Sequence, residues 1–192
     1  SQDVSRQSFL LFTAMGYVPY PYTIMKDVSK LEPASWLSIT DGKISRNRYW
    51  HVKNFGNVQC TEEDVKRNLA ELLQDSIRLQ RRSDVPIGTF LSGGVDSSAV
   101  VSLLAAQVSE PVRTYSIDFK GNPESELPYA KIIADTFHTI HKELIIHSED
   151  IPEHLNTVIG SLDEPISDSA IIPSYLLSKL AIEDGVKVIL NG

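Results

Sequence analysis

Phe90-Leu91-Ser92-Gly93-Gly94-Val95-Asp96-Ser97-Ser98 is the stretch that decides the fold of this 192-residue chain. An apolar run of strand length, residues 85–91, precedes the paired glycines. Apolar residues at helical spacing, residues 95–107, follow them. A strand, a glycine turn and a helix in this order are typical of an α/β domain, in which ligands bind at the carboxyl ends of parallel strands.

The same alternation continues to the end of the chain. Further strands are predicted at residues 112–119, 142–147 and 186–190, and helices at residues 126–137, 148–159 and 169–184. Ahead of the loop, Thr61 is a good N-cap for a helix whose apolar positions repeat at helical spacing as far as Ile77. The pattern predicts an α/β fold with an open, mostly parallel sheet and helices on both faces.

Residues 1–60 follow a different pattern. A short helix is predicted over residues 1–14, and the prolines at 19 and 21 prevent its continuation. Asp41-Gly42 predicts the turn of a β-hairpin over residues 36–50, with Tyr49 and Trp50 as packing residues. We therefore expect a helix, linker and hairpin over residues 1–60, followed by an α/β domain over residues 61–192.

The loop has the chemistry of an anion site. Adjacent glycines let the backbone approach a ligand closely, and the exposed N–H groups at a helix N-terminus attract anions. The serines at 92, 97 and 98 add hydroxyl donors. A carboxylate repels phosphate, so Asp96 fits this loop best as a ligand of Mg²⁺ that meets the phosphate oxygens. The Walker, dinucleotide-binding and nucleophile-elbow patterns are all absent.

Composition excludes several classes of protein. The chain has 25 acidic and 18 basic residues, a net charge of −7, which disfavours nucleic acid as the main partner. Cys60 is the single cysteine, so neither an internal disulfide nor a cysteine zinc cluster can form. No apolar run reaches the length of about 18 residues that a membrane span needs. These features predict a soluble, cytoplasmic protein that does not contact membranes.

Residues 92–98 resemble the pyrophosphate loop of the ATP pyrophosphatase superfamily, whose fold is adenine nucleotide alpha hydrolase-like. Other short motifs, in order, resemble those of glutamine-dependent asparagine synthetases from about Gly16 to Gly192. These motifs are Gly16-Tyr17-Val18-Pro19, Lys30-Leu31-Glu32-Pro33, Arg48-Tyr49-Trp50, Ser83-Asp84-Val85-Pro86-Ile87-Gly88, Tyr129-Ala130, Asp163-Glu164-Pro165 and Tyr175-Leu176-Leu177-Ser178-Lys179-Leu180. The loop alone indicates the superfamily, and the ordered set is much more specific.

The resemblance implies an ATP-dependent, amide-forming ligase. A carboxylate, that of aspartate in asparagine synthetases, attacks the α-phosphorus of ATP, and ammonia released from glutamine then displaces AMP from the acyl-adenylate. It implies that Asp96 binds Mg²⁺ and that Asp163 and Glu164 face the same cleft as candidate catalytic residues. The nucleotide-binding residues it implies are Leu91, Ser92, Gly93, Gly94, Val95, Asp96, Ser97, Ser98, Ile117, Asn191 and Gly192.

The sequence departs from the family pattern at both ends. Ser1 stands where the glutaminase domain would begin with a catalytic cysteine, and Cys60 is misplaced for that role. The acidic, glycine-rich segment and the lysine expected beyond Gly192 are absent. We therefore expect this chain to be the front part of a synthetase domain and to be inactive alone. The complete enzyme is expected to form a homodimer. Two alternatives stay open: an amidotransferase acting on a sugar or β-lactam precursor, and a nucleotide-binding module without catalysis.

Overall fold

The computed structural model describes residues 3–52 and 59–192, and its chain is divided between two units. The first unit consists of Ser1–Gln59 together with Ile159–Ser169, and the second of Cys60–Val158 together with Ala170–Gly192. Segment Ile159–Ser169 thus belongs with the N-terminal region, although the sequence pattern placed it within the α/β domain. No helix among the described residues is both long enough and apolar enough to cross a bilayer.

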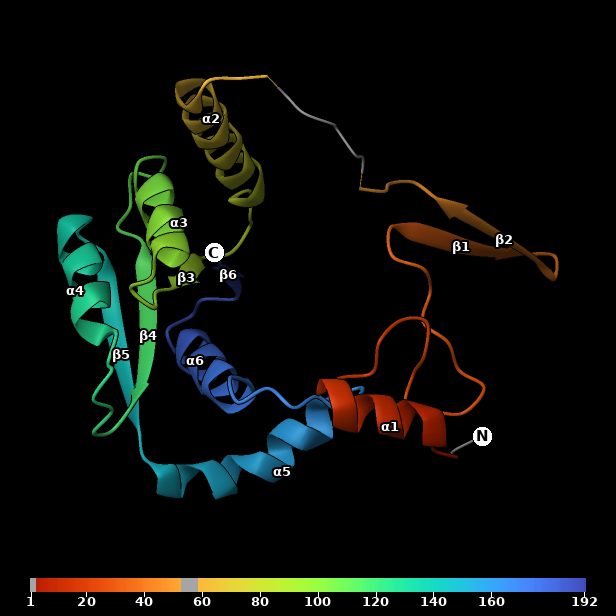
Figure 1. Ribbon diagram of the computed structural model, residues 1–192. Helices are drawn as coiled ribbons and strands as arrows, with labels where there is room; N and C mark the ends of the chain where they lie inside the picture. Colours follow the sequence, from red (N-terminus) through yellow and green to blue (C-terminus); the bar gives the residue numbers. More distant parts are fainter. Residues whose placement is uncertain (1–2, 53–58) are drawn as a thin grey trace. The chain divides into compact units, whose positions relative to one another are not determined.

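A four-stranded sheet forms the centre of the second unit (Figure 1). Its strands are β3 (Ile87–Phe90), β4 (Arg113–Phe119), β5 (Ile140–Ile146) and β6 (Val188–Leu190), in the order β5-β4-β3-β6. All three pairings are parallel, which confirms the predicted architecture. The register aligns Phe90 with Tyr115, so the loop after β3 begins beside the middle of β4.

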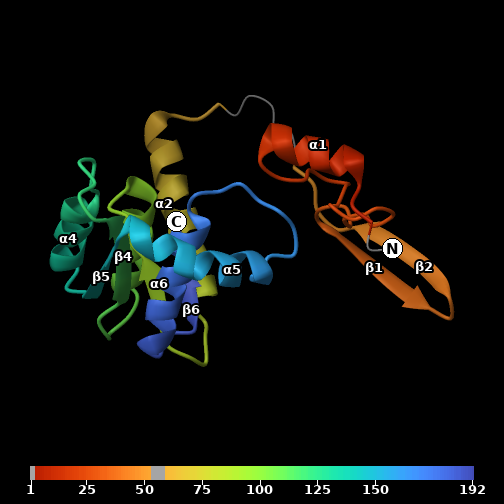
Figure 2. The same ribbon diagram turned by 90° about the horizontal axis from the view of Figure 1, so that it is seen from below.

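Helices cover both faces of this sheet, as predicted (Figure 1). On one face α6 (Ile171–Glu183) buries Leu177 and Ala181 against Tyr115 of β4. On the other face lie α3 (Val95–Ala105) and α4 (Leu127–Thr136), where Val101 packs with Ala130. Figure 2 shows α4 and α6 from below, together with α5 (Ile151–Ser161), which follows a short 3₁₀ helix, Ser148–Asp150.

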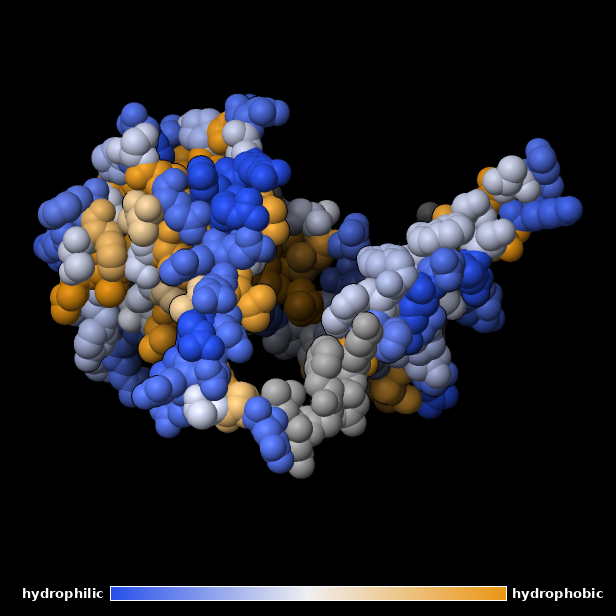
Figure 3. All heavy atoms as spheres, turned by 90° about the horizontal axis from the view of Figure 1, so that it is seen from above, coloured by the Kyte–Doolittle hydropathy of each residue, from blue (hydrophilic) through white to orange (hydrophobic). Residues whose placement is uncertain are grey.

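Helix α2 (Glu62–Gln80) has the predicted cap and a partly uncovered apolar face. The Oγ1 of Thr61 accepts a hydrogen bond from the N–H of Asp64 at 3.1 Å, and the Asp64 carboxylate accepts one from the N–H of Thr61 at 3.3 Å. Ile77 is buried against Leu104 of α3, whereas Val65, Leu69 and Leu72 are exposed. Figure 3 accordingly shows hydrophobic side chains among hydrophilic ones on the side that carries α2.

The described residues of the first unit include helix α1 (Arg6–Met15) and a β-hairpin. Helix α1 begins after Ser5, whose Oγ accepts a hydrogen bond from the N–H of Ser8 at 3.3 Å. Strands β1 (Ser35–Thr40) and β2 (Lys43–Arg48) pair antiparallel around the predicted Asp41-Gly42 turn. The predicted packing role of Tyr49 and Trp50 is wrong, because β2 ends at Arg48 and leaves these side chains 70% and 59% exposed.

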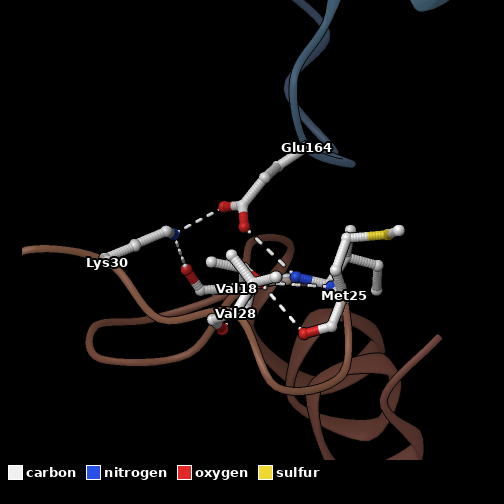
Figure 4. Close-up of polar contacts among 7 residues, drawn as sticks. Val18, Met25, Val28, Lys30 and Glu164 are labelled. Carbon is white, nitrogen blue, oxygen red and sulfur yellow. Dashed lines mark hydrogen bonds and ion pairs between the residues drawn. The ribbon is translucent and has the colours of Figure 1, made fainter. Parts of the chain in front are cut away.

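Polar contacts hold segment Ile159–Ser169 within the first unit (Figure 4). The carboxylate of Glu164 lies 2.6 Å from Nζ of Lys30, and it also accepts a hydrogen bond from the N–H of Ile24 at 3.2 Å. The Lys30 ammonium donates to the carbonyl of Val18 at 2.5 Å. The N–H of Ser167 donates to the carbonyl of Gly16 at 2.7 Å. These bonds join residues that are far apart in the sequence.

Asp184, at the C-terminal end of α6, connects this helix to two strands of the second unit. Its carboxylate accepts hydrogen bonds from the hydroxyl of Tyr115 at 2.8 Å, from Arg113 at 2.9 Å and from Nζ of Lys142 at 2.5 Å. The hydrogen bond from Lys142, followed by that from Tyr115, lowers the pKa of Asp184 to about 2. Burial, with the Asp184 carboxylate as a second cause, raises the pKa of Tyr115.

We expect Asp184→Asn to destabilise the chain near neutral pH and to weaken the dependence of its stability on acid pH. The folded pKa of about 2 lies below the unfolded value of about 3.9, so the contribution of Asp184 is complete above pH 4 and is lost as the pH falls through 2. Urea unfolding at pH 7, 4 and 2.5 measures this, with Asp84→Asn on an exposed loop as the control. If Asp184→Asn lost as much stability between pH 4 and pH 2.5 as the unmodified chain does, the lowered pKa of Asp184 would not be a source of acid sensitivity.

Candidate functional site

The glycine loop leaves the carboxyl end of β3 and remains attached to β4. The N–H of Leu91 donates to the carbonyl of Tyr115 at 2.8 Å, which extends the ladder one residue beyond the strand. The hydroxyl of Ser116 donates to the carbonyl of Leu91. Leu91 is itself 1% exposed. The start of the loop is therefore fixed to the sheet, and its conformation is set from that point.

Hydroxyl groups of the loop serines hold the loop in shape. The Oγ of Ser97 accepts a hydrogen bond from the N–H of Ser92 at 3.3 Å and lies 3.0 Å from the Oγ of Ser92. The N–H of Gly94 donates to the Oγ of Ser92 at 3.2 Å, and the Oγ of Ser98 donates to the carbonyl of Gly94 at 2.6 Å. The serines predicted as donors to a ligand thus also form the framework of the loop.

Two glycines of the site lie where a side chain would not fit. Gly93 has a φ of +88°, and a Cβ there would lie 2.7 Å from the N of Ala130 and 2.8 Å from the Cβ of Tyr129. A Cβ on Gly192 would lie 2.6 Å from the carbonyl carbon of Asp96. The loop consequently packs directly on α4 and on the residues that follow β6.

The N-terminus of α3 offers an anion site with a carboxylate beside it. Gly94 is the N-cap and no side chain caps the helix, so its first N–H groups remain available to a ligand. Asp96 in the first turn is exposed and has no hydrogen-bond or ion-pair partner among residues 3–52 and 59–192. A free carboxylate beside N–H groups that suit an anion has the chemistry of a Mg²⁺ ligand, because Mg²⁺ binds through one or two carboxylates, phosphate oxygens and water.

A pocket of about 240 Å³ opens beside this loop. Six of the predicted site residues line it, namely Leu91, Ser92, Ser97, Ile117, Asn191 and Gly192. Sequence reasoning missed four further lining residues, Phe90, Tyr115, Ser116 and Leu177. A second pocket of about 230 Å³ shares Leu91, Ser92, Ser116 and Ile117 with the first and extends toward Asp118 and Glu126.

Val95, Gly93, Gly94, Asp96 and Ser98 complete the predicted set and lie on the loop or in the first turn of α3. Val95 is 86% exposed, so it is free of protein packing. The remaining candidates, Asp163 and Glu164, belong to the first unit, where the Glu164 carboxylate is already engaged by Lys30 and Ile24. A catalytic role for either residue stays a prediction. Ser116 had a local signal, a hydroxyl within a predicted apolar strand. Leu177 lies in one of the family-like motifs, but nothing in that motif indicated a place in the pocket.

The backbone N–H and C=O of Ile117 point to the β3 side of β4, at a level beyond the end of β3. In a parallel ladder the N–H and C=O groups of alternate residues point to the same neighbouring strand. The carbonyl of Tyr115 bonds to Leu91, on the β3 side, so the N–H and C=O of Ile117 are directed to that side too. Because β3 ends at Phe90, these groups face the pocket that Ile117 lines.

Comparison with known proteins identifies the family. The asparagine synthase family model matches residues 68–192, which is more than half of the chain. This chain belongs to the asparagine synthase family. The resemblance seen in the ordered motifs is thereby confirmed, and the glycine loop, α3, β4 and Gly192 all lie within the matched residues.

Several family members resemble nearly the whole chain. It is 32% identical over 194 residues to a putative glutamine-hydrolysing asparagine synthetase of Methanocaldococcus jannaschii, covering 100% of this chain and 37% of that protein. It is 32% identical over 191 residues to asparagine synthetase 1 of Bacillus subtilis, covering 99% of this chain and 30% of that protein. The chain therefore spans about a third of the length of these relatives.

Solved structures with a similar arrangement include an NH3-dependent NAD synthetase from Campylobacter jejuni. The similarity has a TM-score of 0.40 at 17% identity and covers 66% of this chain and 54% of that one. An NMN synthetase from Francisella tularensis gives a TM-score of 0.43 at 16% identity, covering 68% of this chain and 54% of that one.

Proposed function

We propose that this chain carries the ATP-binding part of an ATP-dependent, amide-forming ligase that converts aspartate to asparagine. The observation that supports this most directly is the glycine loop of an asparagine synthase family member, placed between a parallel strand and a helix N-terminus that no side chain caps. In the proposed reaction a carboxylate oxygen of aspartate attacks the α-phosphorus of ATP, and the bond to pyrophosphate breaks. The nitrogen of ammonia then attacks the acyl carbon, AMP leaves and a proton is released.

We propose that the adenosine part of ATP binds in the pocket beside the loop. Adenine carries the N6–H₂ donor beside ring-nitrogen acceptors, whereas guanine places the O6 acceptor at the position of that donor. The adjacent C=O and N–H groups of Ile117, directed toward the space beyond β3, complement the donor and acceptor of adenine. Leu91 and Leu177 supply apolar walls for the base. This arrangement favours ATP over GTP.

The loop is suited to the leaving group. Negative charge develops on the departing pyrophosphate, and prearranged N–H groups at the start of α3 stabilise it. Asp96 is the proposed ligand of Mg²⁺, which when bound would neutralise charge on the phosphate oxygens. The proximity of Gly93 to α4 keeps the loop backbone, rather than side chains, facing the ligand.

The other substrates and partners follow from the family alone. We infer that ammonia reaches the acyl-adenylate from glutamine hydrolysed elsewhere in the complete enzyme. A homodimer and a cytoplasmic location are further inferences of this kind. A sugar or a β-lactam precursor is the alternative acceptor, on the same adenylating chemistry.

We expect the 192-residue chain to bind Mg·ATP saturably and Mg·GTP at least tenfold more weakly. The reason is that guanine would oppose its O6 to a carbonyl of Ile117, and an unmatched acceptor pair in a desolvated pocket costs about 1–3 kcal/mol. Calorimetric titration with each nucleotide measures both affinities. Equal affinities for ATP and GTP would contradict the placement of the base against Ile117.

A further inference from the structure

The first unit has a pocket of about 290 Å³ that the proposed ligase chemistry does not use. It lies on one face of the β1–β2 hairpin. Ser35 stands opposite Arg48 in the strand register, and Leu37 stands opposite Arg46. Directly opposed residues of an antiparallel pair share a face, and so do residues two apart on one strand. The four side chains therefore project from the same side of the hairpin, and all four line the pocket.

Two of the sequence motifs, one on each side of the hairpin in the chain, meet at this pocket. Lys30 and Glu32 come from the segment before β1, and Arg48 is the last residue of β2. The carboxylate of Glu32 lies 2.9 Å from the Nη1 of Arg48. Arg48 also donates from Nε to the carbonyl of Trp50 at 3.0 Å. The preceding segment is thus bonded to the end of the hairpin and forms the second wall of the pocket.

The pocket has one positive charge that its carboxylates do not compensate. Among the described residues three cations line it, and two of them are paired, Lys30 with Glu164 at 2.6 Å and Arg48 with Glu32 at 2.9 Å. Arg46 has no hydrogen-bond or ion-pair partner within the described ranges 3–52 and 59–192. One guanidinium, with its fork of N–H donors, is consequently available to a ligand.

A buried hydroxyl lacks a partner in the same place. The Oγ of Ser35 is shielded from solvent, and in the part of the chain that the structure describes it makes no hydrogen bond. Buried polar groups are nearly always hydrogen-bonded, and leaving one unsatisfied is unfavourable. Ser35 and Arg46 are diagonal neighbours across the strands, a separation that a long arginine side chain spans. Ser35 lines the pocket, and a rotation about its χ1 would turn the Oγ from its shielded position toward the same anion that Arg46 meets.

We propose that this pocket binds a small carboxylate, with Arg46 as its main cation and Ser35 as a hydroxyl donor. A carboxylate carries the single negative charge that the pocket lacks, and its two oxygens match the planar guanidinium. A phosphate dianion would exceed the uncompensated charge. Leu37, on the same face, offers an apolar surface to the carbon atoms of the ligand. The site is independent of the proposed ligase reaction and of the glycine loop.

The test is a titration of the ¹⁵N-labelled chain with sodium acetate at constant ionic strength, followed by amide NMR. Sodium chloride and sodium phosphate serve as parallel titrants. We expect acetate to give saturable shifts at the hairpin amides around Leu37 and Arg46, and we expect Arg46→Gln to weaken acetate binding at least tenfold. Ser35→Ala should weaken it severalfold. Because Arg46 is exposed, the Arg46→Gln variant should remain folded and give a spectrum that is otherwise unchanged.

Lys43→Gln is the matched control, because it removes one positive charge from the same strand. Lys43 lies three residues from Arg46 in β2, so its side chain projects from the opposite face. It should change the acetate affinity less than twofold. The proposal would be overturned if Lys43→Gln weakened binding as much as Arg46→Gln, if Arg46→Gln had no effect, or if chloride reproduced the shifts. Tighter binding of phosphate than of acetate would overturn the assignment to a carboxylate.

Discussion

Gly93→Ala is expected to weaken ATP binding at least a hundredfold and to destabilise the second unit. Two independent causes act at this position. The φ of +88° is one that an alanine rarely adopts, at a cost of about 1–2 kcal/mol. The added Cβ would lie 2.7 Å from the N of Ala130 and 2.9 Å from the carbonyl oxygen of Glu126, both of which are backbone atoms of a helix end that cannot move alone. The loop would have to leave α4, and its N–H groups would no longer converge.

Gly185→Ala is the control that separates the two causes. Gly185 has a φ of +78°, similar to that of Gly93, but a Cβ there would meet nothing within 4 Å. It precedes β6 at the end of the sheet opposite to the pocket. We expect Gly185→Ala to lower the free energy of unfolding by about 1 kcal/mol and to leave the ATP affinity within threefold. Calorimetry and urea unfolding of both variants provide the measurement, and unimpaired ATP binding by Gly93→Ala would contradict the proposed site.

Local chemistry determined those parts of the second unit that the sequence predicted well. The N-cap of Thr61 depends on a partner three residues away, and β3 is a short apolar run that needs no distant information to be recognised. The glycine loop was identified for the same reason, because close backbone approach and a helix N-terminus are properties of adjacent residues. Predicted boundaries in the second unit differ from the observed ones by one to three residues in either direction, as at residues 85–91 against Ile87–Phe90 and at residues 142–147 against Ile140–Ile146. In the first unit the predicted helix over residues 1–14 begins five residues too early, because Ser5 caps it and it starts at Arg6.

Features that depend on tertiary packing were not predictable from the pattern. Leu177 lines the pocket only because α6 lies on the β4 face with that side of the helix inward. Segment Ile159–Ser169 joins the first unit through the ion pair between Glu164 and Lys30, and the sequence around neither residue predicts this contact. The exposure of Tyr49 and Trp50 was missed because the aromatic content of the segment suggested packing, while the end of β2 was decided by its pairing with Ser35.

Asp96→Asn is expected to remove most of the Mg²⁺ dependence of ATP binding. In the unmodified chain Mg²⁺ should strengthen ATP binding at least tenfold, because the exposed carboxylate of Asp96 and the phosphates would share the ion. In the variant the affinities with and without Mg²⁺ should agree within threefold. Without Mg²⁺ the variant should bind ATP at least as tightly as the unmodified chain, since a carboxylate that repels phosphate has been removed. Calorimetry at several Mg²⁺ concentrations tests both statements.

The competing interpretation of Asp96 is an ordinary acid in the first turn of a helix, where it would stabilise the helix dipole. Asp64 provides the comparison, because it occupies the first turn of α2 and its carboxylate does bond to the helix end, at the N–H of Thr61. Asp64→Asn should lower the thermal midpoint and leave ATP binding unchanged at every Mg²⁺ concentration. The carboxylate of Asp96 makes no such capping bond, so Asp96→Asn should affect Mg²⁺-dependent binding far more than the thermal midpoint. If Asp96→Asn instead behaved like Asp64→Asn in both measurements, Asp96 would be a helix-stabilising residue and the cation would have to be held by other groups.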